Sequence, residues 1–505
     1  MNLANIIDPH DPATVAIISR GRPTTYGELA EQVGRVRGGL ADLGVARGDR
    51  VALLCGNGRY FVETYLATLG LGAVAVPLNP SSPGPEIERE IAVVDASVVI
   101  VDPIASSSWR AVDRDKVPSV RHVVVTEPPR SGPDVDVSWA GHTFADLLAH
   151  EPVPVEEVDD DDLAVLIFTS GTAGAPRAAM LSHGNLLANL HQGRSATTHI
   201  EPGDVVFGVL PLFHIFGLNV VLGLALHRGA SVVLVQRFDP STALDTIRER
   251  KVTVVPGAPP MWLAWSHMDD LPADSFATVR LALTGAAKMP EEAIRRLEER
   301  FGIALAEGYG LTEASPVVTS SAGQALRIGS VGRVLDGVEV RLVDEVGDDV
   351  LDGDAGEIWV RGPNVFKGYL GEPELTARVI TADGWLRTGD IATTDDDGYL
   401  YLVDRAKDLI IVSGFNVYPA EVEEILAAHP AVAEVGVVGV PHPHTGEAVK
   451  AFVVARDGEA GGVDEEVLIA WVGEHLARYK CPTKVLFVDE LPRNVSGKLL
   501  RRELV

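Results

Sequence analysis

Cysteine is nearly missing from this sequence, which has two in 505 residues. Cys55 and Cys481 lie far apart and in no C-x-x-C spacing, which excludes a disulfide framework and a cysteine-based zinc site. A reducing, cytoplasmic setting is therefore the expectation. The N-terminus lacks the basic start and apolar run of a signal peptide. The apolar stretch 66–78 is broken by glycines and a proline and is too short to span a bilayer, so we expect no stable membrane insertion.

Positive charge is also in deficit, because 43 basic residues face 71 acidic ones and the formal net charge is -28. A general nucleic-acid binder needs a cationic surface that releases counterions, so this class is excluded. Stable attachment to anionic lipid is excluded for the same reason. An anionic ligand must then be held by local donors and not by the overall field.

What the sequence does contain is a long alternation of short apolar runs and helical patterns, typical of α/β layers. Asp239 and Pro240 have the form of an N-cap followed by proline at the first helical position. The strands expected from these runs are 50–54, 73–77, 163–168, 231–235, 252–255, 280–284 and 303–306. We therefore predict an α/β fold whose large N-terminal domain has layered, mostly parallel sheets and helices.

The pattern changes after Tyr401, where about 100 residues read as a compact α+β unit. The expected elements are a helix at 419–428, strands at 435–440 and 449–455, a helix at 464–476 and a strand at 484–488. We place the boundary near Asp404, which predicts domains 1–403 and 404–505.

Three polar segments each have two interpretations. The acidic run 156–162 suits a metal site or, as we favour, a solvated connecting loop. The acidic segment 395–398 has the same two interpretations, and its Asp-Gly ending indicates a hairpin turn. His442 and His444 suit a metal or a surface loop, and we favour the loop because no further ligand is fixed nearby.

The strongest local signal is the segment 168–177, FTSGTAGAPR. Glycines let backbone N–H groups point inward, hydroxyls add donors and Arg177 adds a cationic fork, which together suit a polyphosphate. Gly-Lys-Ser/Thr is absent, so the loop is not a Walker A motif. The apolar run 178–181 indicates strand–loop–strand, with a helix beginning only near Ser182. The alternative is a flexible hairpin without a ligand.

Further motifs follow in order along the chain, at 180–183 (MLSH), 211–217 (PLFHIFG), 307–313 (EGYGLTE), 384–390 (GWLRTGD), 404–408 (DRAKD) and 492–498 (PRNVSGK). Together with 168–177 they resemble the adenylate-forming (AMP-binding) superfamily, in particular acyl-CoA synthetases of the fatty acid–CoA ligase type. The resemblance covers essentially the whole chain. It implies an acid–thiol ligase that makes an acyl-adenylate from ATP with release of pyrophosphate, and then a CoA thioester and AMP.

The resemblance also assigns the nucleotide site. The cations and donors must lie where phosphate charge develops, because an anion approaches a polyanion. Arg177 stands where the family usually has lysine, which keeps the charge and alters its geometry. The implied ATP-binding residues are Thr169, Ser170, Gly171, Thr172, Gly174, Arg177, Gly285, Ala286, Ala287, Glu307, Gly308, Tyr309, Asp390 and Arg405.

Catalytic roles follow from the same resemblance. Glu313 would bind Mg²⁺ through carboxylate oxygens, and Thr312 would touch the α-phosphate. Lys498 would swing into the site during adenylation, since the small domain is expected to be mobile. The hinge lies near 404–407, at Lys407. After rotation, the segment Ser413, Gly414 and Phe415 would meet the thiol of CoA.

The acyl pocket is expected at His214, Phe216, Gly217 and Leu218, with His214 as a wall or gate and not a core histidine. The apolar surroundings favour a fatty or other apolar acid. A malonyl or aryl acid, a carrier-protein phosphopantetheine as acceptor, and a non-catalytic nucleotide-binding scaffold are the alternatives. The sequence leaves the acyl carrier protein and a homodimeric state open.

Overall fold

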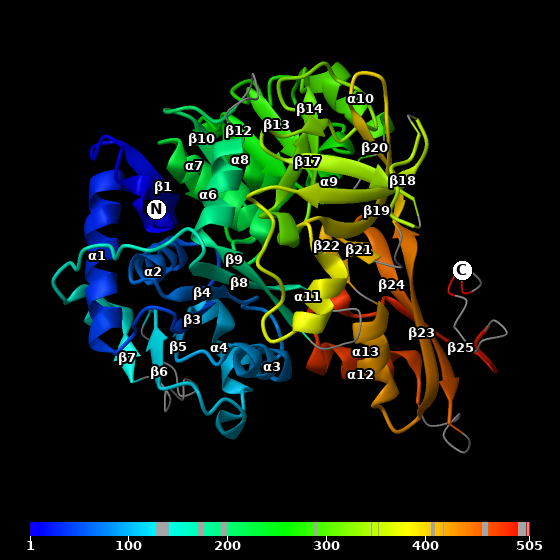
Figure 1. The fold of residues 1–505 in the computed structure, drawn as a ribbon, viewed down its shortest axis with the longest axis horizontal. Coiled ribbons are helices and arrows are strands. Elements are labelled where there is room, and N and C mark those ends of the chain that lie inside the picture. The colour runs from blue at the N-terminus through cyan, green and yellow to red at the C-terminus, as the bar shows by residue number, and fades with distance from the viewer. Residues whose placement is uncertain are drawn as a thin grey trace.

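The computed structural model describes residues 1–504 except 128–140, 170–175, 193–198, 287, 288, 290, 345, 352, 406–409, 418, 457–462, 493–500, 502 and 503, and except the side chains of 403–405, 416 and 420. Figure 1 shows a large unit, blue to yellow, and a smaller orange and red unit against one side of it.

The first sheet of the large unit has the strand order β7-β6-β5-β3-β4-β8-β9. Its pairs are parallel up to β8, and β8–β9 is antiparallel. Continuous Val/Ile/Leu runs form such strands because both faces are covered. The strands are β3 (Arg50–Leu54), β4 (Val74–Pro77), β5 (Val98–Val101), β6 (His122–Val125), β7 (His142–Thr143), β8 (Leu163–Thr169) and β9 (Arg177–Ser182).

The second sheet has the order β16-β15-β14-β13-β12-β10-β11-β1-β2, parallel from β14 to β1 and antiparallel at both edges. Its strands are β1 (Val15–Ser19), β2 (Arg22–Thr25), β10 (Val205–Gly208), β11 (Ser231–Leu234), β12 (Val254–Gly257), β13 (Leu281–Thr284), β14 (Leu305–Gly310), β15 (Val317–Ser320) and β16 (Arg333–Val334).

Helices connect the parallel strands, as right-handed crossovers require. α1 begins with a capping box in which Thr25 accepts from Glu28 N–H. α8 begins as predicted, with Asp239 Oδ1 accepting from Thr242 N–H at 2.9 Å. The α-helices are α1 (Tyr26–Asp42), α2 (Arg59–Gly70), α3 (Gly84–Val94), α4 (Ser106–Arg110), α5 (Phe144–Leu148), α6 (His183–Gln192), α7 (Leu224–His227), α8 (Pro240–Glu249), α9 (Pro259–Ser266), α10 (Glu291–Phe301) and α11 (Pro373–Val379). The 3-10 helices of this unit are η1 (Leu3–Ile7), η2 (Pro103–Ala105), η3 (Arg114–Lys116) and η5 (Thr312–Ala314). η4 (Phe216–Gly223) is a π-helix.

An antiparallel sheet, in the order β17-β18-β19-β20, completes the large unit. Its strands are β17 (Glu339–Val343), β18 (Gly356–Arg361), β19 (Leu386–Thr394) and β20 (Leu400–Arg405). Gly398 N–H donates to Asp395 O at 2.9 Å between β19 and β20, so the predicted hairpin turn is confirmed.

The small unit has a mixed sheet in the order β22-β21-β24-β23, with β25 beside β24, and a core of its own. Its elements are β21 (Ile410–Val412), β22 (Phe415–Val417), α12 (Pro419–Ala427), β23 (Val432–His442), β24 (Gly446–Ala455), α13 (Glu465–His475), η6 (Arg478–Lys480) and β25 (Lys484–Phe487). The predicted α/β class with a small α+β C-terminal unit is confirmed. The boundary at 404 stays a prediction.

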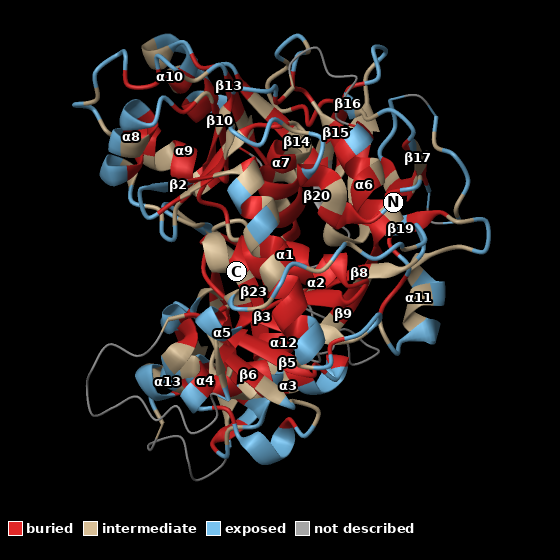
Figure 2. Ribbon diagram, turned by 90° about the vertical axis from the view of Figure 1, so that its left-hand side faces the viewer, coloured by how far each residue is buried: buried red, intermediate tan, exposed pale blue. Residues whose placement is uncertain are grey.

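One apolar cluster runs through the strands of both parallel sheets, drawn red in the middle of Figure 2.

Predicted and observed elements differ mainly at their ends. The strand expected at 303–306 is Leu305–Gly310, because pairing with β13 and β15 sets its ends. In the described ranges, no helix has the length and apolar character needed to cross a membrane.

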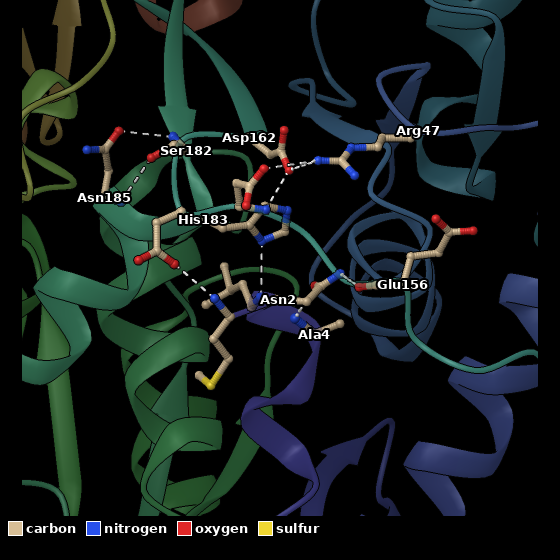
Figure 3. A network of polar contacts seen from close by, with 12 residues as sticks. Asn2, Ala4, Arg47, Glu156, Asp162, Ser182, His183 and Asn185 are labelled. Atoms are coloured by element: carbon tan, nitrogen blue, oxygen red, sulfur yellow. Dashed lines mark hydrogen bonds and ion pairs between the residues drawn. The ribbon is translucent and has the colours of Figure 1, made fainter.

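The acidic run 156–162 is held by ion pairs, in agreement with a structural loop. Asp160 pairs with the Met1 amino group at 2.9 Å, Asp161 with Lys367, and Asp162 with Arg47. His183, at the start of α6, lies in the middle of this network (Figure 3), and its Nδ1 accepts from Leu3 N–H at 3.0 Å.

Candidate active site

The predicted phosphate loop is closed by an antiparallel strand pair. Thr169 at the end of β8 is opposite Arg177 at the start of β9, and α6 begins after β9 ends. The strand–loop–strand prediction is therefore confirmed at both ends of the loop. Ser170, Gly171, Thr172 and Gly174 lie outside the described residues.

The ends of β13 and β14 lie side by side, with Thr284 opposite Glu307. A Cβ added to Gly285 would lie 3.4 Å from the Phe216 ring and 3.5 Å from Gly308 O. Ala286 follows with a left-handed φ of 72°, uncommon for a residue with a side chain. These contacts bring the predicted adenine residues together, and Ala287 lies outside the described part of the chain.

β14 is linked to β19 through a side-chain hydrogen bond. Tyr309 Oη donates to Asp390 Oδ2 at 2.7 Å. The residue predicted to border adenine thus orients the residue predicted to bind ribose, although the two are 81 positions apart. Arg405 lies opposite Asp390 on β20, and its side chain is not described.

Thr312 and Glu313 form the short turn η5 directly after β14. Tyr369 Oη donates to Glu313 Oε1 at 2.6 Å, and Phe366 N–H donates to Glu313 O at 2.9 Å. The carboxylate is therefore oriented by the segment before α11. Its hard oxygen atoms are of the type that Mg²⁺ prefers.

His214 precedes the π-helix η4, a form of helix that is frequent at functional sites. His214 Nδ1 accepts from Phe216 N–H at 3.3 Å. Burial lowers the pKa of His214 to about 4, so the ring is neutral at pH 7. Gly217 packs against Pro211, whose O atom would lie 2.1 Å from an added Cβ, so only glycine fits here.

The turn between β21 and β22 reaches the large unit. Ser413 and Gly414 both have left-handed φ values, of 53° and 84°. The Phe415 ring stacks on Phe213, with centroids 6.2 Å apart, and meets His214 edge-on at 6.2 Å. Phe415, one of the three residues predicted to meet CoA, is thus beside the predicted acyl pocket.

A cavity lies where these elements meet. It is lined by Pro77, Leu78, Asn79, Ser82, Glu86, Glu90, Phe168, Thr169, Pro176, Phe213, His214, Thr312, Phe415, Glu421, Tyr479 and Lys480. Four predicted site residues are therefore in one cavity, namely Thr169, His214, Thr312 and Phe415. Phe216, Gly217 and Leu218 are not among the lining residues, and Leu218 is fully buried.

Lys407, the predicted hinge, and Lys498, the predicted adenylation lysine, lie outside the described residues. Sequence reasoning missed the far wall of the cavity, formed by Glu86, Glu90, Glu421, Tyr479 and Lys480. One sequence feature pointed to this wall. Glu86 and Glu90 lie four positions apart on α3, each followed by a buried isoleucine.

Two family models match this chain. The description "AMP-binding enzyme" matches residues 8–370, and "AMP-binding enzyme C-terminal domain" matches residues 421–498. A feruloyl-CoA synthase of Amycolatopsis sp. is 38% identical over 495 residues, covering 98% of this chain and 96% of its own. A long-chain-fatty-acid–CoA ligase of Bacillus subtilis (strain 168) is 34% identical over 516 residues, covering 98% and 92%.

Solved structures are similar over the full length. The amide bond synthetase McbA from Marinactinospora thermotolerans has a TM-score of 0.88 at 32% identity, covering 100% of this chain and 99% of its own. ATP-bound MatB from Rhodopseudomonas palustris has a TM-score of 0.73 at 34% identity, covering 100% and 98%.

Proposed function

This chain belongs to the AMP-binding enzyme family and is an AMP-forming acid–thiol ligase, and on that premise we propose that it activates an apolar monocarboxylic acid, alkyl or aryl, for transfer to CoA. The observation that carries the proposal is the shared cavity. It joins Thr169, His214 and Thr312 of the large unit to Phe415 of the small one.

One side of this cavity favours an apolar acid, because Phe168, Phe213 and Phe415 line it and His214 is neutral. The opposite side, which contains Glu86 and Lys480, is polar. Among the described lining residues the one cationic side chain is Lys480, which is held by Glu86 and Glu421. A second carboxylate, as in malonate, therefore meets no available cation in the described wall.

In the first half-reaction, the acid's carboxylate attacks the α-phosphorus of ATP and pyrophosphate leaves. The loop between Thr169 and Arg177 holds the phosphates, Thr312 contacts the α-phosphate and Asp390, oriented by Tyr309, accepts from the ribose hydroxyls. Mg²⁺, when bound, supplies positive charge to the phosphates, and Glu313 is the residue that would hold it.

Lys498 supplies a further positive charge in this half-reaction. Lys498→Ala should lower acyl-adenylate formation about 100-fold or more, because charge on the α-phosphate loses its partner. CoA thioester formation from supplied acyl-adenylate should fall less than about threefold. Lys251→Ala, at an exposed lysine in the turn after α8, is the matched control. Equal loss of both half-reactions would refute the role of Lys498.

In the second half-reaction, the thiol of CoA attacks the acyl carbon and AMP leaves. Gly414 has a left-handed φ of 84°, and a residue without a side chain suits a thiol that passes beside the backbone. An added Cβ would make ordinary contacts with Ala258 and Ala286, at 3.4 and 3.6 Å.

The substrate class is tested by pyrophosphate release with decanoate, ferulate, benzoate, acetate and malonate, followed by loss of the free thiol of CoA. We expect the first three to be activated and malonate to fail. Activation of malonate above all apolar acids would overturn the proposal. The same assay with a holo-carrier protein or an amine instead of CoA tests the other acceptors. A non-catalytic scaffold is set aside, because the chain matches ligases over nearly its full length.

A further inference from the structure

The first turns of α3 dock the small unit onto the large one through a buried ion pair. Lys480 Nζ lies 2.6 Å from Glu86 Oε1, and Ala477 N–H donates to Glu86 Oε2 at 2.7 Å. Both oxygens of one carboxylate in the large unit therefore bind the small unit. Arg89, also on α3, donates to His475 O at the end of α13, at 3.3 Å.

The charges at this contact are almost fully enclosed. The side chains of Lys480 and Glu86 are 8% and 4% exposed, and Glu421, which is 2.9 Å from Lys480 Nζ, is 6% exposed. Removing one partner of a buried pair leaves an uncompensated charge, which is strongly unfavourable. Glu421 and Lys480 both belong to the small unit. Among the three residues, Glu86 is therefore the one whose charge is compensated only when the small unit is docked on the large unit.

Glu90 lies one helical turn after Glu86 and lines the same cavity. Burial, and then the neighbouring Glu86 carboxylate, raise the pKa of Glu90 well above its usual value, and burial also raises the pKa of Glu421. Lys480 therefore lies among three buried acidic side chains and binds two of them, Glu86 and Glu421.

The ion pair is connected to the reaction centre through stacked rings. Tyr479, next to Lys480, stacks on Phe415 with centroids 4.4 Å apart and an interplanar angle of 25°. Phe415 in turn contacts Phe213 and His214. Any shift of η6 on α3 therefore moves the ring beside Gly414.

We propose that Glu86 is a positioning residue for the thioester-forming half-reaction: by binding Lys480 and Ala477 N–H, it holds Tyr479 and Phe415 so that the turn 413–415 closes the cavity. This inference rests on the proposed function, since it assumes two half-reactions that need different poses of the small unit. We therefore expect Glu86 to matter less for adenylation, which needs the other pose.

Glu86→Gln tests this role, and Glu88→Gln is the matched control. Glu88 lies on the same helix and is 5% exposed, but it binds Lys116 Nζ at 3.0 Å and Asp113 N–H at 2.6 Å, both within the large unit. Glu86→Gln should lower kcat for acyl-CoA formation from supplied acyl-adenylate about 10- to 100-fold. Adenylation and KM for CoA should change less than about threefold, and Glu88→Gln should change none of these.

A double-mutant cycle separates positioning from simple loss of packing. If Glu86 acts through Lys480, the losses in thioester formation from Glu86→Gln and Lys480→Met should be non-additive, with the double variant within about threefold of the worse single variant. Additive losses, or equal loss of both half-reactions in Glu86→Gln, would overturn the inference.

A distance measurement tests docking without relying on activity. Spin labels at Asp115→Cys and Glu466→Cys, both exposed, report the two units in a Cys481→Ser background. Glu86→Gln should lower the docked fraction at least about threefold, while Glu88→Gln leaves it unchanged. If wild-type enzyme releases pyrophosphate but transfers nothing to CoA, the proposed function fails, whereas an unchanged docked fraction in Glu86→Gln refutes the positioning role alone.

Discussion

His183 and His214 are neutral histidines in two regions of the molecule with different roles, a structural network and the candidate active site. Burial lowers the pKa of each to about 4. His183 is fully enclosed, and its Nδ1 accepts from Leu3 N–H, which fastens the N-terminal turn to α6 (Figure 3). His214 lines the cavity and faces the edge of Phe415.

The difference shows that a lowered pKa marks burial and not function. Both residues belong to motifs of the family resemblance, so motif membership does not separate them either. What separates them is access, because His183 meets only protein atoms of a structural network and His214 borders the cavity shared by both units. Three measurements test this distinction.

The largest effect is expected from His183→Ala. The variant leaves Leu3 N–H without its acceptor and opens a cavity, and it should lower the free energy of unfolding by about 3 kcal/mol. Urea unfolding measures the loss, and kcat per folded molecule should stay within about twofold. A tenfold fall in kcat with unchanged stability would show that His183 is functional.

Asp160→Asn is the control within the same network. Its ion pair with the Met1 amino group is largely exposed, with 76% of the Asp160 side chain accessible, so we expect a loss below about 0.5 kcal/mol.

The second prediction concerns acid. His183 has a folded-state pKa of about 4, mainly because it is buried, against 6.5 in the unfolded chain. The unfolded state therefore gains a proton first, and stability is full above pH 6.5 and is lost as the pH falls toward 4. The loss should reach about 1.4 kcal/mol near pH 5.5 and about 3 kcal/mol once the pH is below 4.

In His183→Gln, the amide oxygen can still accept from Leu3 N–H but does not titrate. The urea midpoint of this variant should therefore fall less between about pH 7.5, 6 and 5 than that of the wild type. An unchanged slope would mean that other groups cause the acid sensitivity. Activity should not follow protonation of His214 above about pH 5, because that ring is already neutral.

The smallest effect is expected from His214→Ala. Losing the ring between Phe216 N–H and Phe415 should lower kcat/KM for the acid about tenfold, or about 1.4 kcal/mol, while the urea midpoint hardly changes. His214→Phe keeps an aromatic wall and should recover most activity with an apolar acid. A large loss of stability in both variants would make His214 a core residue like His183.

Local sequence predicted most elements and one side of the site. The phosphate loop between β8 and β9, the N-cap at Asp239 and the turn at 395–398 each follow from the conformational demands of a few neighbouring residues. The opposite side of the cavity was not predictable. Lys480 and Glu86 are 394 positions apart, and neither carries a local signal of its partner.

The class of fold, the order of elements and the residue types available for phosphate and metal follow from the sequence, because periodicity, caps and turns are local properties. Three features depend on how the chain packs in three dimensions. These are which buried histidine borders the cavity, the orientation of Asp390 by Tyr309, and the compensation of Glu86 by a lysine of the other unit. These are contacts between distant segments, and their energies depend on burial and distance, which are set when the sheets and the two units pack together.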